Sequence, residues 1–370
     1  MGKASSLSKH IALLGFALLF ILLMAEAALR ITTPPTFRQR PFLNFPWVVY
    51  DPIVRWQNKP DFEAPSVQFA GARIPIEWRI NHQGFRGPAL EHSKKKGTIR
   101  IVCLGDSGTF GIWRGTNLET DPPELRGGFD GYPDELRKIL RGRGGNEVEV
   151  INGGVLGYSS AHGLRQLTTQ LLEIDPDVMT VRFGMNDHGL AWDSSLAVHD
   201  PESLAGRFLL QHFHGWRLYR LLASSLHRLK ARNSQSYTTR WVSPYQFEEN
   251  LRRFVEIARD EGIELLFVDY PLRPIDAGKP LSRYQRRLLL TERGVASKEA
   301  FYALHAGYQA VLERVVTDTS SQILRSTETF DASPTPVFSD DDLVHPNRHG
   351  AKLLAQLLFD ELAGLGWLGR

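Results

Sequence analysis

The sequence predicts an α/β protein in which strands and helices alternate to build a parallel sheet, preceded by an apolar N-terminal helix. Runs of branched apolar residues, typical of buried parallel strands, alternate along the chain with segments of helical periodicity. The first such run, residues 99–104, ends abruptly in Gly-Asp-Ser-Gly at 105–108. Polar side chains at the carboxyl end of a strand lie where open α/β sheets bind ligands.

Composition is consistent with one large domain plus extensions. The chain has 370 residues, and 42% of them are hydrophobic, enough for a substantial core. Lys and Arg total 44 against 41 for Asp and Glu, and a net charge of +3 is too balanced to indicate nucleic acid as a partner. The single cysteine, Cys103, lies inside the first predicted strand, where we expect a small buried hydrophobic residue.

The N-terminal element is a stretch at 11–29 that is apolar except for Glu26. As a helix it is about 27 Å long, just enough to cross a bilayer core. One interpretation is an uncleaved signal anchor that holds everything after Arg30 outside the cytoplasm. The other is a signal peptide cleaved near Ala25-Glu26-Ala27, which gives a secreted protein. We favour the anchor, because the apolar run is longer than a typical signal core.

The rest of the chain is expected to divide in two after an anchor at 1–30. Residues 31–97 are rich in proline and aromatic residues without helical periodicity, and predict a stalk that becomes an irregular lead-in. Residues 98–370 form the predicted α/β domain, with insertions near 113–131, 201–240 and 272–298. The last insertion is a candidate rim or lid. In the middle one, apolar residues interleaved with arginines from Trp216 onward predict a basic amphipathic helix.

Within residues 98–370, hydrophobic periodicity predicts the order of the elements. We expect strands at 99–104, 148–151, 178–183 and 263–270, with a weak strand at 323–330, and helices at 134–141, 164–172, 244–259, 299–316 and 350–365.

Four polar motifs follow strands or precede helices in this scheme. They are Gly-Asp-Ser-Gly at 105–108, the block that begins at Asn152, Gly-Met-Asn-Asp at 184–187, and Asp-Leu-Val-His at 342–345. Because the carboxyl ends of parallel strands meet at one edge of the sheet, we expect the motifs to converge there.

With these motifs in this order, the chain from about residue 99 to the C-terminus resembles the SGNH hydrolases, a subgroup of the GDSL-type esterases and lipases. The resemblance implies a three-layer α/β/α flavodoxin-like fold and an extracytoplasmic, membrane-anchored enzyme of bacterial type. Residues 80–88 also resemble the "N-x-x-G-F-R-G" lead-in of anchored members, for which we expect a structural role.

The resemblance also implies site residues. Ser107 is the nucleophile, His345 the general base, and Asp342 the group that orients His345. The oxyanion hole consists of the backbone N–H groups of Ser107 and Gly157 and the side-chain amide of Asn186. Gly154 is the alternative to Gly157 if the block is displaced by three positions.

Neighbouring residues suggest other roles. Asp106 and Asp187 are expected to fix their loops by accepting backbone N–H groups. Arg182, in an otherwise apolar strand, lies either at its solvent end or beside a buried acid. The residues Asp340, Asp341, Asp342, His345 and His349 form an alternative metal cluster, but Pro346 disfavours placing His345 inside a helix. Thr109 departs from the G-x-S-x-G elbow and disfavours the α/β-hydrolase fold.

The predicted function is therefore a serine esterase that uses no cofactor and no metal. Its expected substrates are small acyl esters or acylated saccharides, including O-acyl groups on a surface polysaccharide. Its other expected partner is the membrane, through the N-terminal helix. Two alternatives stay open: an O-acyltransferase that passes the same acyl-enzyme to a saccharide, and a non-catalytic protein that binds or assembles a surface polymer.

Overall fold

The chain divides into two compact units in the computed structural model. One unit comprises Met1–Asn44 and Trp192–Tyr237, and the other comprises Phe45–Ala191 and Thr238–Arg370. The structure describes residues 2–33, 44–51, 54–69, 72–91, 93–117, 124–141, 148–190, 208–209, 212–213, 215–222, 225, 240–274, 280–339 and 342–368. Most of the predicted insertion at 201–240, including most of its basic helix, lies outside these residues.

In the first unit, α1 (Gly2–Thr32) is the predicted N-terminal helix. Its segment Ala12–Thr32 has a mean hydropathy of 2.4 and is long and apolar enough to cross a membrane. This fits a signal anchor and a signal peptide alike.

Glu26 ties the end of α1 to the second segment of the same unit. Its carboxylate accepts hydrogen bonds from Arg30 Nε at 2.7 Å and from the backbone N–H groups of Arg217 and Leu218 at 3.2 and 2.8 Å. Arg217 in turn donates to the carbonyl groups of Leu29 and Arg30 at the end of the helix, and the Leu29 carbonyl also accepts the Thr33 N–H at 3.0 Å. The only acid in the apolar stretch is thus fully partnered within this unit.

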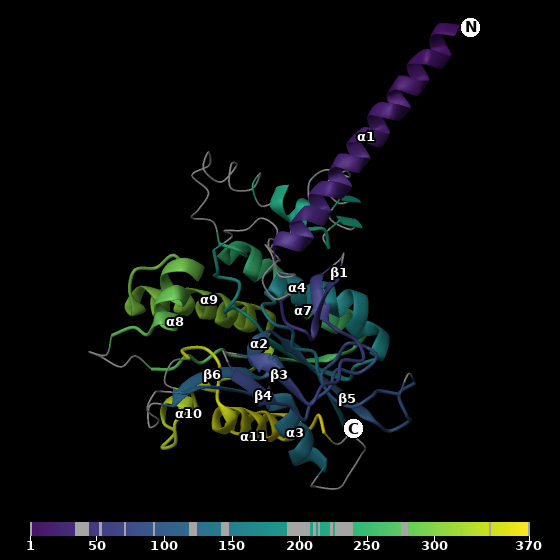
Figure 1. The fold of residues 1–370 in the computed structure, drawn as a ribbon. Helices are drawn as coiled ribbons and strands as arrows, with labels where there is room; N and C mark the ends of the chain where they lie inside the picture. Colours follow the sequence, from purple (N-terminus) through teal and green to yellow (C-terminus); the bar gives the residue numbers. More distant parts are fainter. Residues whose placement is uncertain are drawn as a thin grey trace. The chain divides into compact units, whose positions relative to one another are not determined.

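The second unit is organised around a parallel sheet, with strands β5 (Ile99–Gly105), β8 (Val148–Asn152), β9 (Val178–Arg182), β10 (Glu264–Val268) and β11 (Gln322–Leu324) (Figure 1). Its strand order, β11-β10-β9-β5-β8, is the flavodoxin-like order, which confirms the predicted fold class. The order reverses direction between β5 and β9. Ligands bind at such a switch point, outside the carboxyl ends of the strands.

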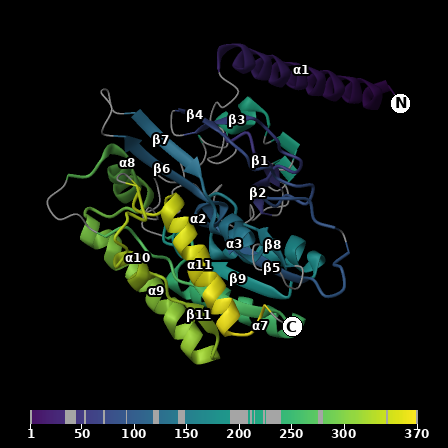
Figure 2. The same ribbon diagram turned by 90° about the horizontal axis from the view of Figure 1, so that it is seen from below.

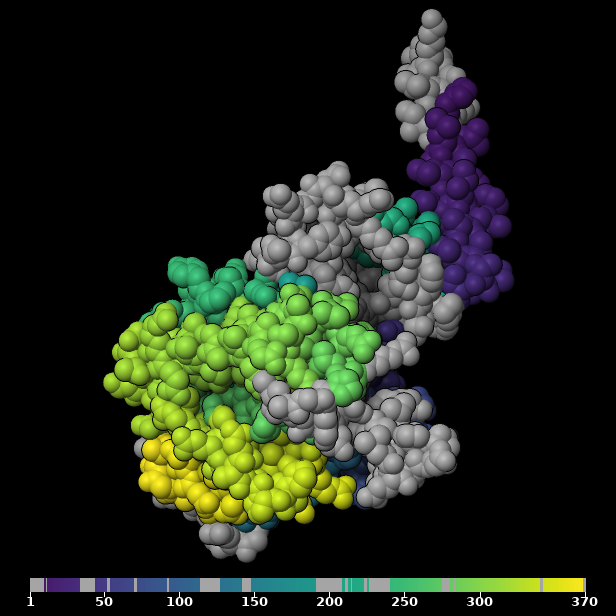
Figure 3. Space-filling model, turned by 90° about the vertical axis from the view of Figure 1, so that its left-hand side faces the viewer, coloured from purple at the N-terminus to yellow at the C-terminus, as the bar shows by residue number. Residues whose placement is uncertain are grey.

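Helices cover both faces of this sheet. Helices α4 (Ser160–Gln166), α7 (Pro244–Glu261) and α9 (Lys298–Thr319) lie on one face, and α3 (Tyr132–Arg141) and α11 (Arg348–Gly364) lie on the other (Figures 1 and 2). The space-filling view shows the segments from α7 to the C-terminus, green to yellow, forming one continuous surface (Figure 3).

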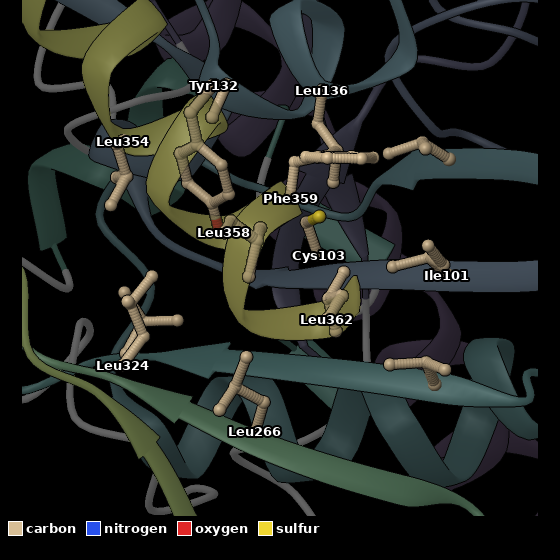
Figure 4. Packing of buried hydrophobic residues seen from close by; sticks show 14 of the residues in the cluster. Ile101, Cys103, Tyr132, Leu136, Leu266, Leu324, Leu354, Leu358, Phe359 and Leu362 are labelled. Atoms are coloured by element: carbon tan, nitrogen blue, oxygen red, sulfur yellow. The ribbon is translucent and has the colours of Figure 1, made fainter. Parts of the chain in front are cut away.

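One core cluster fills the space between the sheet, α3 and α11 (Figure 4). Ile101 and Leu266 from the sheet pack with Leu136 of α3 and Leu358 of α11, all 0% exposed. Cys103 is buried among them, as predicted, and burial raises the pKa of its thiol to about 12. The thiol is therefore neutral and acts as an apolar side chain.

The lead-in is more regular than the sequence predicted. The antiparallel hairpins β1–β2 (Val48–Asp51, Arg55–Asn58) and β3–β4 (Ser66–Phe69, Ala72–Pro75) occupy it. Trp47 and Trp56 are 0% exposed, and the Trp47 ring stacks on that of Phe110 at 6.4 Å between centroids. From Phe45 onward the lead-in thus packs as part of the second unit. Strands of this length give too few residues for a periodicity to be recognised.

Other elements differ from their predicted form. The weak strand expected at 323–330 is β11 only to Leu324, and α10 (Thr327–Asp331) follows, because the Asp269 carboxylate accepts the backbone N–H groups of Ser326 and Thr327 at the start of that helix. The helix expected at 164–172 begins at Ser160 and continues as a π-helix at Leu167–Leu171.

The predicted insertions contain secondary structure in their described parts. The one near 113–131 contains the hairpin β6–β7 (Ile112–Asn117, Glu124–Phe129). The one at 272–298 contains α8 (Arg283–Arg286) and a π-helical segment (Arg287–Glu292).

Candidate active site

The ends of β5 and β9 lie level with each other at the switch point, since Gly105 pairs with Arg182 in the register of the two strands. After β5 the chain turns at once into α2 (Ser107–Phe110), whose N-cap is Asp106. A Cβ on Gly105 would lie 2.1 Å from Thr109 Oγ1, so only glycine permits this tight turn. Ser107 thus stands at the start of a helix on the edge where ligands are expected.

The C-terminal motif reaches Ser107 from 238 positions away in the sequence. Ser107 Oγ lies 2.8 Å from His345 Nε2, and His345 Nδ1 lies 2.9 Å from Asp342 Oδ2. Asp342 is 0% exposed and His345 8% exposed, whereas Ser107 is partly exposed. The structure therefore brings these predicted site residues into one continuous chain of hydrogen bonds with the hydroxyl at its open end.

The pKa of the Asp342 carboxyl is lowered despite its burial. Desolvation raises this pKa. The charge of His345, its ring N–H, and the backbone N–H groups of Val344 and His345 together lower it by more than desolvation raises it. A carboxylate held ionised in this way accepts the Nδ1 proton of His345. That leaves Nε2 as the acceptor that faces Ser107.

The block after β8 runs beside the nucleophile turn. The Val155 N–H donates to the carbonyl of Gly105 at 3.2 Å, and a Cβ on Gly154 would lie 2.2 Å from Phe110 N. The Gly154 N–H is occupied by Asn152 Oδ1 at 3.0 Å. Gly157 has φ +75°, and among the described residues its N–H has no hydrogen-bond acceptor. An N–H without an acceptor favours Gly157 over Gly154 as an oxyanion donor.

Asn186 lies in the loop after β9 and is connected to both neighbouring loops. Its side-chain Nδ2 donates to the carbonyl of Tyr158 at 3.0 Å and to Asp106 Oδ2 at 3.2 Å. Like Ser107, it is partly exposed while the residues around it in the sequence are buried. The amide therefore lies at the open side of the site, between the turn that carries Ser107 and the loop that carries Gly157.

Asp106 is the centre of a buried polar group that the sequence did not predict as a whole. It accepts the Gly108 N–H at 2.8 Å, as expected, and also the Tyr270 hydroxyl at 3.0 Å. Burial raises the pKa of Asp106, and the charge of Arg182 opposes this rise. Arg182 is 0% exposed and its guanidinium lies 3.7 Å from the centre of the Tyr270 ring. Of the placements expected for Arg182, the solvent end is wrong and the one beside a buried acid is supported.

Asp187 fixes the loop after β9, as predicted. Its carboxylate accepts the backbone N–H groups of Ser160 and Gly184 at 3.0 and 3.1 Å. Burial raises the pKa of Asp187 to about 6, although the hydrogen bonds from Ser160 and Gly184 lower it. The carboxyl joins the start of α4 to the end of β9 and holds Asn186 next to it in place.

The alternative metal cluster is not assembled among the described residues. There, no group of three or more His, Cys, Asp or Glu side chains could hold a metal ion. His345 is used between Ser107 and Asp342, and His349 is exposed on α11. Asp340 and Asp341 lie outside the described residues.

The lead-in contributes contacts to the site that sequence reasoning missed. Trp56 Nε1 donates to the carbonyl of Leu156 at 2.7 Å, and Asn58 Nδ2 donates to that of Gly154 at 3.1 Å. Arg86, in the segment at 80–88, donates to the carbonyl groups of Phe110 and Phe129. The available signal was the density of aromatic residues in a segment interpreted as a stalk.

Comparison with known proteins identifies the family. The profile of the GDSL-like Lipase/Acylhydrolase family matches residues 103–353. Similar solved structures include a lipase/acylhydrolase from Enterococcus faecalis, with 18% identity and a TM-score of 0.42 over 72% of this chain and 96% of that one. A GDSL-like lipase from Bacteroides thetaiotaomicron has 13% identity and a TM-score of 0.40, over 75% and 93%. A catalytic mutant of Axe2, an acetylxylan esterase from Geobacillus stearothermophilus, has 14% identity and a TM-score of 0.42, over 71% of this chain and 94% of that one.

No curated protein matches the sequence. The family profile covers more than half of the chain and includes the motifs from Gly105 to His345. The protein belongs to the GDSL-like lipase/acylhydrolase family and is a hydrolase that acts on ester bonds.

Proposed function

We propose that the protein is a serine esterase in which Ser107 attacks the ester carbonyl, His345 acts as general base and Asp342 orients His345. The observation that carries the proposal is the 2.8 Å contact between Ser107 Oγ and His345 Nε2. A serine hydroxyl is a weak nucleophile until a base accepts its proton, and this contact supplies the base.

Each half of the reaction uses the same groups. His345 takes the proton as Ser107 Oγ bonds to the acyl carbon, and returns it to the alcohol oxygen as the ester bond breaks. A water molecule then gives its proton to His345 and attacks the acyl-enzyme, and Ser107 recovers its proton as the acid leaves. The buried, ionised Asp342 stabilises the imidazolium that forms in each half.

The negative charge of the tetrahedral intermediate requires fixed donors opposite the nucleophile. We assign this role to the backbone N–H groups of Ser107 and Gly157 and to the Asn186 amide. Ser107 N is at the start of α2, and the Gly157 N–H has no acceptor among the described residues. Asn186 Nδ2 already has two acceptors, so the oxyanion replaces the longer contact, that with Asp106.

Labelling of Ser107 tests the catalytic assignment. A fluorophosphonate reacts with a serine hydroxyl only where a base activates it, so we expect one equivalent on the folded protein, located at Ser107 by peptide mass spectrometry. The matched control is Ser107→Ala, which keeps the buried Ser159 and Ser160 nearby. Label on the wild-type protein at any other residue, or equal labelling of the variant, would contradict the assignment.

For the substrate, we propose small acyl esters, including O-acyl groups on a surface saccharide. An open-edged site with a partly exposed Ser107 and Asn186 supports access by an ester on a larger molecule. With an acetylated oligosaccharide, the expected products are free acetate and the deacetylated sugar. Transfer of the acetyl group to an added saccharide would instead indicate an acyltransferase.

We also propose that α1 is a signal anchor, with the boundaries 1–30, 31–97 and 98–370 for anchor, lead-in and catalytic domain. The apolar segment Ala12–Thr32 supports this, as does the complete pairing of Glu26 with Arg30 and the segment around Arg217. N-terminal sequencing of the mature protein tests it, since a start after Ala27 would indicate a cleaved signal peptide and secretion.

A further inference from the structure

We infer that Trp56, in the lead-in, positions the oxyanion hole by fixing the peptide group between Leu156 and Gly157. This inference rests on the proposed function, in which the Gly157 N–H stabilises the oxyanion. It gives the lead-in a role in the reaction, although the lead-in contributes no group that touches the substrate.

The decisive contact is the hydrogen bond from Trp56 to the peptide group between Leu156 and Gly157. Trp56 Nε1–H donates to the carbonyl oxygen of Leu156 at 2.7 Å. That carbonyl and the Gly157 N–H belong to the same planar, trans peptide, so they point in opposite directions. A donor that holds the carbonyl on the side of β2 therefore holds the N–H on the side away from β2.

The side away from β2 is the side of the nucleophile. The loop that carries Gly157 lies between β2 and the turn after β5. On one side Trp56 and Asn58 hold its carbonyl groups, and on the other the Val155 N–H bonds to Gly105 and Gly154 packs against Phe110 N. With the peptide in this orientation, the Gly157 N–H is free of internal acceptors among the described residues.

Several contacts fix the position of Trp56 itself. It is 0% exposed, and its own carbonyl accepts the Tyr158 hydroxyl at 2.6 Å, so residues on both sides of Gly157 are bonded to Trp56. The His162 ring lies 4.8 Å from the Trp56 ring between centroids. The residue before Trp56, Arg55, has φ +75°, a conformation unusual for a residue with a side chain. The first residue of β2 thus adopts a strained backbone conformation directly before the indole that contacts this loop.

Two effects follow for catalysis. Gly157 has φ +75° and no side chain, so its flanking peptide can rotate at low cost unless a bond prevents it. A rotated peptide would present the Leu156 carbonyl, not the N–H, to the developing negative charge. The indole hydrogen bond also polarises the peptide, which makes the Gly157 N–H a stronger donor. Both effects act on the transition state and only weakly on substrate binding.

The test is the Trp56→Phe variant, which keeps an aromatic ring and removes the N–H donor. Removing an oxyanion donor lowers kcat by about 10²–10³-fold, and misorienting one is expected to lower it by about 10-fold with KM changed less than about 3-fold. Steady-state kinetics with p-nitrophenyl acetate on the full chain in detergent measures this, with active sites counted by fluorophosphonate labelling.

Trp47→Phe is the matched control. Trp47 is also a lead-in tryptophan with 0% exposure, but among the described residues its Nε1 has no hydrogen-bond partner. We expect this variant to lose a similar amount of thermal stability while its kcat stays within about 2-fold of wild type. If the kcat of both variants falls in parallel, or Trp56→Phe folds with unchanged kcat, the inference is wrong.

A second substitution covers the case in which Trp56→Phe does not fold. Benzothienylalanine at position 56 has the shape of tryptophan with sulfur in place of the N–H, so it removes the donor without creating a cavity. The same fall in kcat is expected, and an unchanged kcat overturns the inference. Turnover by the wild-type protein that Ser107→Ala leaves intact would instead refute the proposed function itself, so the two failures are distinguishable.

Discussion

Replacing His345 by alanine is expected to lower kcat for p-nitrophenyl acetate hydrolysis by about 10⁴-fold or more, with the fold retained. The imidazole is the only described group within hydrogen-bonding distance of Ser107 Oγ, so its removal leaves the hydroxyl without a base. The remaining rate would come from substrate binding and the oxyanion donors alone. Circular dichroism and a thermal melt establish that the variant is folded, and steady-state kinetics measures the loss.

The sequence supplies a matched control for this experiment. His349 lies four residues further along the chain, is exposed in the first turn of α11, and donates its backbone N–H to Asn347 Oδ1. His349→Ala is therefore expected to keep kcat within about 2-fold of wild type. A folded His345→Ala protein that keeps more than about a tenth of the wild-type kcat would eliminate His345 as the general base.

Acidification is expected to destabilise the second unit between about pH 6.5 and pH 4, because this unit buries histidines in their neutral form. Burial lowers the pKa of His162 from 6.5 to about 3 and that of His305 to about 4, and it lowers the pKa of His188 as well. Since these folded-state values lie below the unfolded value, the unfolded chain binds more protons in this window. The stabilising contribution is complete above pH 6.5 and is lost as the pH falls.

The loss of stability depends on how far the folded-state pKa of each histidine lies below its unfolded value. Each histidine lowers the free energy of unfolding by about 1.4 kcal/mol per pH unit, so His162 alone accounts for about 3 kcal/mol at pH 4. Asp187 acts in the opposite direction, because its pKa is raised to about 6 and the folded state binds the extra proton. Asp106, whose pKa is also raised, opposes the histidines too. Burial raises the pKa of Asp331 as well, so this acid also opposes the histidines. The unfolded chain begins to protonate its histidines near pH 6.5, above the pKa of about 6 of Asp187, so we expect the net slope to be towards lower stability in acid.

Urea denaturation of the full chain in detergent, at about pH 7.5 and at about pH 5, measures this dependence. In His162→Gln the free energy of unfolding is expected to fall less steeply as the pH is lowered. The slope should be smaller than that of the wild type by about 1.4 kcal/mol per pH unit, which corresponds to one proton fewer bound on unfolding. His82→Gln is the control, since the His82 side chain is 84% exposed. Equal slopes for wild type and His162→Gln would show that His162 is not buried in its neutral form.

The sheet and the positions of the polar motifs were predictable because each depends on local sequence. A buried parallel strand is a run of branched apolar residues, and the polar residues that end it must lie at one edge. Ser107, Asn186 and His345 could therefore be expected at that edge without knowledge of the intervening segments, and Ser107 Oγ does lie 2.8 Å from His345 Nε2. Their hydrogen-bonded roles came from the resemblance to a family, since spacing alone does not relate Ser107 to a histidine so distant in sequence.

The contacts made by the lead-in were not predictable in this way. Trp56 reaches Leu156, 100 positions away, from a strand of four residues that has no recognisable period. Asp106 and Tyr270 are likewise joined across 164 positions. In both cases the sequence shows only that an aromatic residue is present. Whether its polar atom bonds to solvent or to a distant loop is decided by the packing of the whole unit.

The position of Trp56 also bears on how a shortened version of the enzyme should be made. A boundary chosen from the family profile, which begins at residue 103, would discard the indole that braces the Leu156–Gly157 peptide, and the first residues of β5 as well. Starting the chain at Phe45 instead retains the whole compact unit that contains Ser107. Protein trimmed at the profile boundary is therefore expected to lose stability as well as catalytic rate, for reasons that lie outside the homologous region.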